Sequence, residues 1–301
     1  MAVDADALQH PKTRPVELLQ RRSFRHRLWI GSVTLLVAFG SLFLLWPVWF
    51  MFITSLKTSG GAFILPIKWL PYIQYQPQWV NFKEAHEFMK WTVVYGNTIK
   101  VASTAMIGDV LSATFVAYGF ARFRAPFRNL LFTMMLATLM IPFAVRLVPE
   151  YLSFARLGMV DTFWPLILPP WLGSAFNIFL LRQFFTTIPL AMDEAATIDG
   201  AGPLRILFQI LVPQIRPALI VVAIGAFTFH WNDFLRPLLY LNLPENRTAA
   251  VALSFFSASY GGTPFNLLMA AALVMLIPVL LLFFTLQRYY IQGVVISGVK
   301  G

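Results

Sequence analysis

Two groups of polar residues inside apolar stretches of this chain are the first candidates for chemistry. Asp109 stands near the middle of one stretch, and His230-Trp231-Asn232-Asp233 precedes Arg236 in another. Amides and carboxylates pair with hydroxyls, and an indole face stacks on the apolar face of a sugar, so the second group suits a polyhydroxylated ligand. The alternative is an Asp233–Arg236 pair one helical turn apart, which would support a helix end or a subunit interface.

Asp109 also has two alternative roles. An ionisable group in the middle of an apolar helix is costly if it faces lipid, so we expect Asp109 to face a partner helix or a water-filled space. A structural hydrogen bond and a role in transport both remain open for it.

Known catalytic patterns are absent from the sequence. There is no GxxxxGK followed by Ser or Thr to cradle phosphates, no HExxH among the four histidines, no GxSxG elbow and no cysteine. We therefore expect no catalytic, cofactor-binding or metal residues, and any energy from ATP has to be supplied by another protein.

The elements that carry these residues are apolar stretches of membrane-spanning length. The chain is 58% hydrophobic and 12% charged, against roughly a quarter charged in soluble domains. A helix needs about 17 to 25 apolar residues to cross the membrane, and it satisfies its own backbone hydrogen bonds in lipid. We therefore predict an all-α membrane protein with six transmembrane helices. These lie at residues 28–56, 101–120, 129–145, 162–181, 218–241 and 267–286.

The basic residues follow membrane topology better than they follow a nucleic-acid-binding face. The net charge is +10, but Lys and Arg stand in short clusters between apolar stretches, so we expect no nucleic acid partner. An even number of spans and an arginine-rich amino terminus predict that both termini are cytoplasmic. The predicted organisation is a basic cytoplasmic segment at 1–27, a permease domain at 28–288 and a cytoplasmic tail at 289–301.

The amino-terminal apolar stretch is a signal anchor in this interpretation. Its length exceeds the roughly 7 to 15 apolar residues of a cleaved signal peptide. Arg21-Arg22-Ser23-Phe24 superficially matches a twin-arginine export signal, but the anchor explains the same charges.

The segment 189–213, between the fourth and fifth predicted spans, reads as two short helices around a glycine turn. Pro189 fits a first helical position, and Asp193 and Glu194 fall in early turns, where carboxylates complement the helix dipole. Gly200 can adopt the left-handed conformation that ends a helix, and Pro203 can start the next one. The alternative is an ordinary amphipathic interfacial loop.

This segment also carries a family signature. Glu194-Ala195-Ala196, three residues, Gly200, nine residues and Ile210-Leu211-Val212-Pro213 resemble the coupling-loop signature of ATP-binding cassette importer permeases, with Val212 where Leu is usual. The resemblance implies a cytoplasmic coupling helix between spans four and five that docks on an ATPase. It assigns this coupling to Asp193, Glu194, Ala195, Ala196, Asp199, Gly200 and Pro213, with Glu194 as the polar contact and Gly200 as the turn.

Further stretches look like carbohydrate-importer permeases, and the chain most resembles the maltose-type second permease. These stretches include Asn97-Thr98, Ala117 to Arg122, Leu139 to Pro142, Phe179 to Phe185 and Trp231 to Phe234. The resemblance implies two ATPase subunits that use ATP and Mg²⁺, a second, different permease, an extracytoplasmic solute-binding protein and a prokaryotic inner membrane. The candidate substrate pathway comprises Asn97, Asp109, Trp231, Asn232 and Asp233, and the cargo is a sugar, oligosaccharide or related polyol.

Two rival functions belong to other classes. An ion- or proton-coupled secondary transporter would use Asp109 and Asp233 as carriers. An intramembrane enzyme would need a catalytic constellation that the sequence does not contain.

Overall fold

A computed structural model describes residues 16–62, 64–255 and 264–298. Helices account for nearly all of the regular structure in these ranges, which contain no β-strand. The chain divides after Phe52 into two units, which are described separately below. Residues 1–15 of the predicted amino-terminal segment and residues 299–301 of the predicted tail lie outside the described residues.

The first unit is dominated by helix α1 (Val16–Ser55), whose last residues belong to the second unit. Its stretch Leu28–Ser55 is long and apolar enough to cross a membrane. Side chains such as Leu35, Phe39 and Leu44 are exposed on this helix. An apolar helix surface of this length suits lipid or other subunits as its surroundings.

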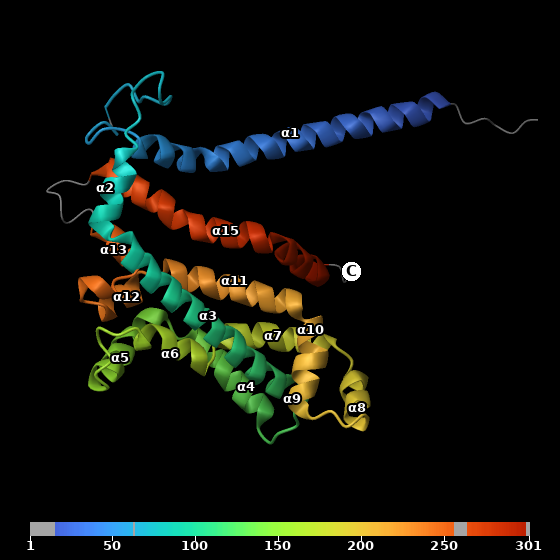
Figure 1. The fold of residues 1–301 in the computed structure, drawn as a ribbon. Coiled ribbons are helices and arrows are strands. Elements are labelled where there is room, and N and C mark those ends of the chain that lie inside the picture. The colour runs from blue at the N-terminus through green and yellow to red at the C-terminus, as the bar shows by residue number, and fades with distance from the viewer. Residues whose placement is uncertain (1–15, 63, 256–263, 299–301) are drawn as a thin grey trace, which may run out of the picture. The chain divides into compact units, whose positions relative to one another are not determined.

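The second unit begins with the end of α1, the short helix α2 (Val80–Met89) and the long helix α3 (Trp91–Arg122). Helix α3 starts ten residues before the predicted span. Small side chains on α3, including Ala102, Ala105, Ala113 and Ala117, are fully buried. They let α6, α7 and α11 pack closely against it, so α3 is the central helix of this unit, as Figure 1 shows.

The third predicted span, 129–145, is broken. Helix α4 (Arg128–Ala137) and a 3₁₀ turn (Thr138–Met140) end before Pro142, and α5 (Phe143–Arg156) leaves at 100°. Pro142 favours the break because its ring clashes with the preceding turn and disfavours a helical conformation at Ile141, whose backbone is extended. The apolar run therefore turns where a continuous helix was expected, and α5 carries Arg146, Glu150 and Arg156 away from the α4 axis.

The fifth predicted span, 218–241, ends earlier than expected. Helix α11 (Arg216–Asn232) stops at Asp233, whose backbone is extended, and α12 (Leu235–Tyr240) is a separate short helix. Before α11, the helical pieces over Pro203–Gln214 meet it at 84°. The fourth span corresponds to α6 (Trp164–Leu172) and α7 (Ala175–Thr187), which are joined at Gly173 and Ser174.

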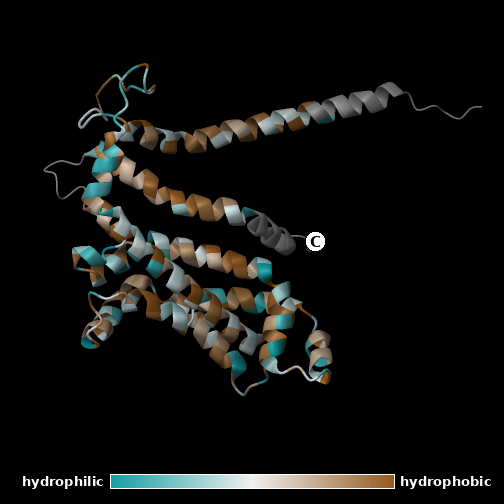
Figure 2. Cartoon of the chain, viewed as in Figure 1, coloured by the Kyte–Doolittle hydropathy of each residue, from teal (hydrophilic) through white to brown (hydrophobic). Residues whose placement is uncertain are grey.

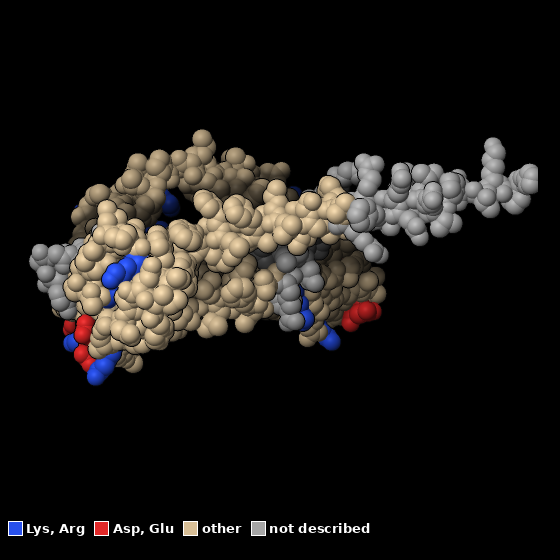
Figure 3. All heavy atoms as spheres, turned by 90° about the horizontal axis from the view of Figure 1, so that it is seen from above, with Lys and Arg blue, Asp and Glu red and all other residues tan. Residues whose placement is uncertain are grey.

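The last described part of the chain contains a turn, a short helix and a long helix. After a 3₁₀ turn (Pro244–Asn246) and α13 (Ala249–Ser254), α15 (Phe265–Gly298) continues through residues assigned to the tail. Within residues 16–62, 64–255 and 264–298, four helices are long and apolar enough to span a membrane, or up to six if each bent pair is one span. Hydrophobic residues dominate the middle of these helices in Figure 2, and the described part of the face seen in Figure 3 is mostly uncharged, with Lys, Arg, Asp and Glu in small groups.

The α3–α6 contact depends on Gly108. A Cβ atom at this position would lie 2.4 Å from Cδ1 of Trp171, and Trp171 is held there by donating from Nε1 to the Thr104 carbonyl at 3.1 Å. We expect Gly108→Val to destabilise the fold by about 1–3 kcal/mol through overpacking. The melting temperature of the purified protein measures this, and Gly119→Ala on the same helix is the control because a Cβ there meets nothing within 4 Å. Equal melting temperatures for Gly108→Val and wild type would contradict this packing.

Asp161 ties the turn before α6 to the turn after α12. Its carboxylate accepts from the backbone amides of Leu243, at 3.0 Å, and Asn242. These amides hold the pKa of Asp161 below its ordinary value. Because the pKa of Asp161 is lower in the folded protein, its carboxylate adds to the free energy of unfolding. This stabilisation is complete above the pKa of the unfolded state and is lost as the pH falls through the pKa of the folded state.

We expect Asp161→Ala to speed amide hydrogen exchange at Asn242 and Leu243 by roughly tenfold at neutral pH, because both amides lose their acceptor. The difference from wild type should shrink at strongly acidic pH. Unchanged exchange at neutral pH would show that the carboxylate does not hold this turn.

Candidate functional site

The segment 189–213, named here the coupling segment, is a compact helical hairpin. Helix α8 (Leu190–Ile198) is followed by Asp199 and by Gly200, which has φ +79°. Helix α9 (Pro203–Arg205) then leads into a π-helical stretch (Ile206–Leu211) and α10 (Val212–Gln214). The left-handed Gly200 and the start at Pro203 confirm the predicted turn. Pro189 precedes the first helical residue instead of occupying it. In Figure 1 the hairpin lies at the opposite end of its unit from α2, α12 and α13.

Helix α8 has one exposed face and one anchored face. Glu194, Ala195 and Asp199 are exposed, and Ile198 is 87% exposed although it is a large apolar side chain. Ala196 is buried on the opposite face, in a cluster with side chains of α3, α7 and the π-helical stretch. The predicted coupling residues therefore divide into an outward group that can meet a partner and an inward group that holds the helix.

Asp193 belongs to the inward group. Its Oδ2 lies 2.8 Å from Nε of Arg122 at the end of α3, and their side chains are only 16% and 6% exposed. Burial raises the pKa of Asp193 above its ordinary value, and the Arg122 guanidinium opposes part of that rise. Local sequence pattern does not predict this pair because 71 positions of chain separate its members (193 − 122). Opposite charges at the ends of two neighbouring helices were the available signal.

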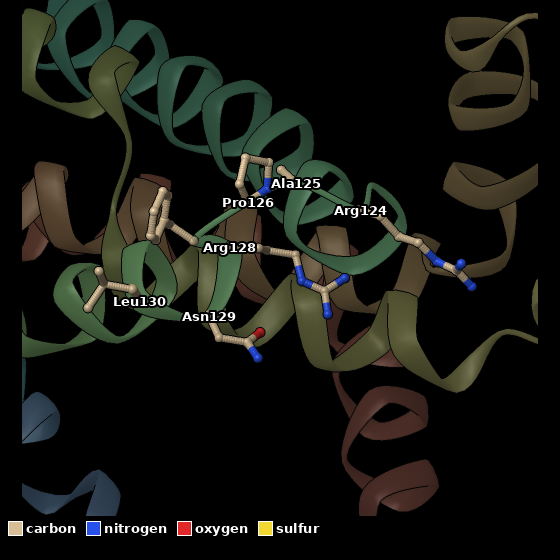
Figure 4. Close-up of a pocket in the computed structure, with 7 residues that line it drawn as sticks. Arg124, Ala125, Pro126, Arg128, Asn129 and Leu130 are labelled. Atoms are coloured by element: carbon tan, nitrogen blue, oxygen red, sulfur yellow. The ribbon is translucent and has the colours of Figure 1, made fainter.

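A second basic feature lies at the same end of α3. The loop between α3 and α4 forms a hollow of about 480 Å³ lined by residues 124–130. Figure 4 shows the side chains of Arg124 in this loop and of Arg128 and Asn129 at the start of α4. Arg128 donates to the Phe123 carbonyl at 3.2 Å. This end of the unit thus concentrates arginines beside the coupling segment.

Asp109, near the middle of α3, contacts helix α11. Its Oδ2 lies 3.0 Å from Nε2 of His230 on α11, and both side chains are more than nine-tenths buried. Asp109 therefore faces a partner helix, as expected from the cost of exposing a carboxyl to lipid. Both residues stand out in the sequence as polar groups within apolar stretches, but their pairing depends on how α3 and α11 pack.

Both members of this pair also line a cavity of about 960 Å³. The cavity lies among α3, α4, α7 and α11, and its polar lining includes Arg146 of α5, Asn177 of α7 and Arg236 of α12. Arg236 lies 4.0 Å from Glu150 of α5. The Arg236 guanidinium thus contacts Glu150, where the sequence offered Asp233 as its alternative partner. Asp233 accepts from the backbone amide of Arg236 at 3.4 Å and so supports the start of α12.

The other pathway candidates lie away from this cavity. Asn97 donates from Nδ2 to the carbonyls of Glu245 and Arg247, at 2.7 and 3.1 Å, and holds the start of α3 to the turn that includes Pro244–Asn246. Trp231 is 1% exposed and stacks against Phe227. Asn232 is exposed and donates to the carbonyl of Thr228 in its own helix. The structure therefore brings Asp109 and His230 together at the cavity but does not bring Asn97, Trp231, Asn232 or Asp233 to it.

No group of three or more His, Asp or Glu side chains arranged to hold a metal ion occurs among the described residues.

Helices of spanning length and an anchored hairpin with an exposed face are the features of a multi-pass membrane protein. Residues 110–296 match the family described as "Binding-protein-dependent transport system inner membrane component". The chain belongs to this family and is an inner-membrane permease of an ATP-binding cassette importer. Membership implies ATPase and solute-binding partners, and it does not favour the ion-coupled alternative.

Named relatives cover most of the chain. The sn-glycerol-3-phosphate transport system permease protein UgpE of Pectobacterium atrosepticum is 33% identical over 265 residues, which are 86% of this chain and 93% of that protein. The galactooligosaccharides transport system permease protein GanQ of Bacillus subtilis is 32% identical over 279 residues, or 89% and 94%.

The fold is similar to that of a solved structure. A chain of a bacterial ABC transporter involved in the import of the acidic polysaccharide alginate superposes with a TM-score of 0.74, at 20% identity, over 88% of this chain and 97% of that one. This likeness agrees with the all-helical fold described above.

Proposed function

We propose that this permease moves a sugar, oligosaccharide or related polyol across the membrane without altering it. The named relatives serve glycerol-3-phosphate and galactooligosaccharides, which are polyol- and sugar-based solutes. The cavity beside Asp109 and His230 is the candidate pathway within this chain because it combines amide, guanidinium and carboxyl groups with apolar walls. Asp109 is its candidate substrate-facing carboxyl.

The exposed face of α8 is the observation that carries the proposed mechanism. Glu194 projects from a short helix whose other face is buried and ion-paired. A hairpin held in this way transmits displacement as a rigid body, whereas a loosely held loop would absorb it. We assign the contact with the ATPase to Glu194, Ala195 and Asp199, the turn to Gly200 and the entry to the fifth span to Pro213.

The proposed assembly contains two ATPase subunits, a second and different permease and an extracytoplasmic solute-binding protein. This chain binds no cofactor and is not itself an enzyme, and its ATPase partners use ATP and Mg²⁺. The end that carries α8, Arg122, Arg124 and Arg128 faces the cytoplasm, in accordance with the positive-inside rule. Both termini lie on that side.

The assembly is tested by purifying the tagged permease after co-expression with candidate ATPase, permease and binding-protein subunits. The expected result is a complex with two ATPase copies and one copy of a second permease. Recovery of this chain with no ATPase would overturn the proposed assembly. Thermal stabilisation of the binding protein across a panel of sugars and polyols identifies the cargo, and stabilisation by amino acids alone would overturn its class.

A further inference from the structure

The coupling segment is covalently joined to α7 and α11, yet its polar anchors lie on α3. Arg122 contacts the segment and the residue just before it: Nε lies 2.8 Å from Asp193 in the first turn of α8, and the other end of the guanidinium donates to the carbonyl of Ile188, which follows α7, at 3.0 Å. One turn earlier on α3, the Tyr118 hydroxyl donates to the Pro203 carbonyl at 3.2 Å. The end of α3 therefore holds the entry of α8 and the start of α9 together.

The local electrostatics favour this arrangement. Arg122 is the last residue of α3, where the partial negative charge of the helix dipole suits a cation, and Asp193 lies in the first turn of α8, where the dipole suits an anion. Both side chains are largely buried. Separating the two side chains would leave an uncompensated buried charge on each helix. The pair therefore favours keeping the start of α8 against the end of α3.

The same helix α3 reaches the cavity. Asp109 stands 13 positions before Arg122 (122 − 109) and pairs with His230 on α11. Displacement of α8 that is passed to Arg122 would therefore move the helix that carries a cavity-lining carboxyl. A path through the covalent connections alone would go first to α7 and α11.

We propose that Arg122 and Asp193 are positioning residues that join the coupling helix to α3, so that ATPase-driven movement of α8 reaches the cavity through α3. This inference rests on the proposed coupling function of α8. It separates the coupling residues into Glu194, which meets the ATPase, and Asp193, which transmits the movement inward.

The test measures solute uptake per ATP hydrolysed in proteoliposomes that contain the full importer. Arg122→Gln and Asp193→Asn remove the charges with little change in shape. We expect both variants to assemble with the ATPase as wild type does, and their uptake per ATP to fall on the order of tenfold. The double variant should be no worse than either single variant because the two residues act as one link. Arg124→Ala, an exposed arginine on the adjacent loop, is the matched control.

A second measurement restores the link chemically. The chain contains no cysteine, so Arg122→Cys combined with Asp193→Cys can be joined by a short bifunctional thiol reagent. We expect the joined protein to regain uptake per ATP and each single-cysteine variant treated in the same way to remain uncoupled. Unchanged coupling in the charge-removing variants, or no recovery after joining, would overturn the proposal.

The assembly readout separates this proposal from the function on which it rests. Glu194→Ala should lose the ATPase, whereas Arg122→Gln should keep it. Failure of Arg122→Gln to assemble would assign the pair to folding and would also overturn the positioning role. Unchanged assembly and uptake in Glu194→Ala would instead contradict the proposed coupling surface.

Discussion

Glu194→Ala and Gly200→Pro should each insert into the membrane normally and lose ATP-driven uptake by roughly tenfold or more. Glu194 is exposed and makes no ion pair within the described residues, so its removal should weaken only the contact with the ATPase. Gly200 has φ +79°, whereas proline holds φ near −65°, so the turn between α8 and α9 cannot form in the second variant. Co-purification of the ATPase and uptake in proteoliposomes measure both effects.

Matched controls separate these effects from general damage. Gly202→Ala changes a neighbouring glycine whose φ is −74°, a value that alanine adopts freely. Glu84→Ala removes an exposed carboxylate from α2, at the other end of the unit, and should leave ATPase association intact. Loss of association in these controls, or its retention in both test variants, would contradict the assignment of α8.

The second large effect is expected at the Asp109–His230 pair. Asp109→Leu leaves His230 buried without its partner and should destabilise the protein by about 1–3 kcal/mol, with a corresponding loss of assembled importer. Asp109→Asn keeps a group that can hydrogen-bond to the imidazole and should be milder. Thermal unfolding of the purified permease measures the difference.

The double variant Asp109→Leu/His230→Leu distinguishes a structural role from a role in transport. Replacing both partners removes the unsatisfied group, so stability should recover relative to Asp109→Leu. If uptake stays low while stability recovers, the pair also serves the pathway. Stability losses that simply add in the double variant would show that the two side chains do not act as a pair.

The fold class and the glycine turn followed from the sequence because they depend on local physics. Apolar run length predicts spanning helices, and Gly200 and Pro203 mark where α8 ends and α9 begins. The bends were harder to predict. Hydropathy continues across Pro142 and Asp233, but the backbone turns at both positions, so a window of apolar residues overestimated the length of spans three and five.

The contacts between residues far apart in the chain could not be predicted from the local sequence pattern. Asp109 was expected to face a helix or water, but which helix depends on how α3 and α11 pack. An Asp233–Arg236 pair one turn apart was one of two alternatives, yet the break at Asp233 removes the helical geometry on which that pairing depends, and Arg236 approaches Glu150 instead. Trp231 has the chemistry of a sugar platform, but the packing of α11 buries its ring.

The most direct test of the account is the energy source of uptake. Proteoliposomes containing the importer and its binding protein are supplied with ATP on the side of α8, with and without an agent that collapses ion gradients. The account predicts that uptake requires ATP and persists when the gradients are collapsed. Uptake by this chain without any ATPase, driven by an imposed proton or sodium gradient, would contradict it.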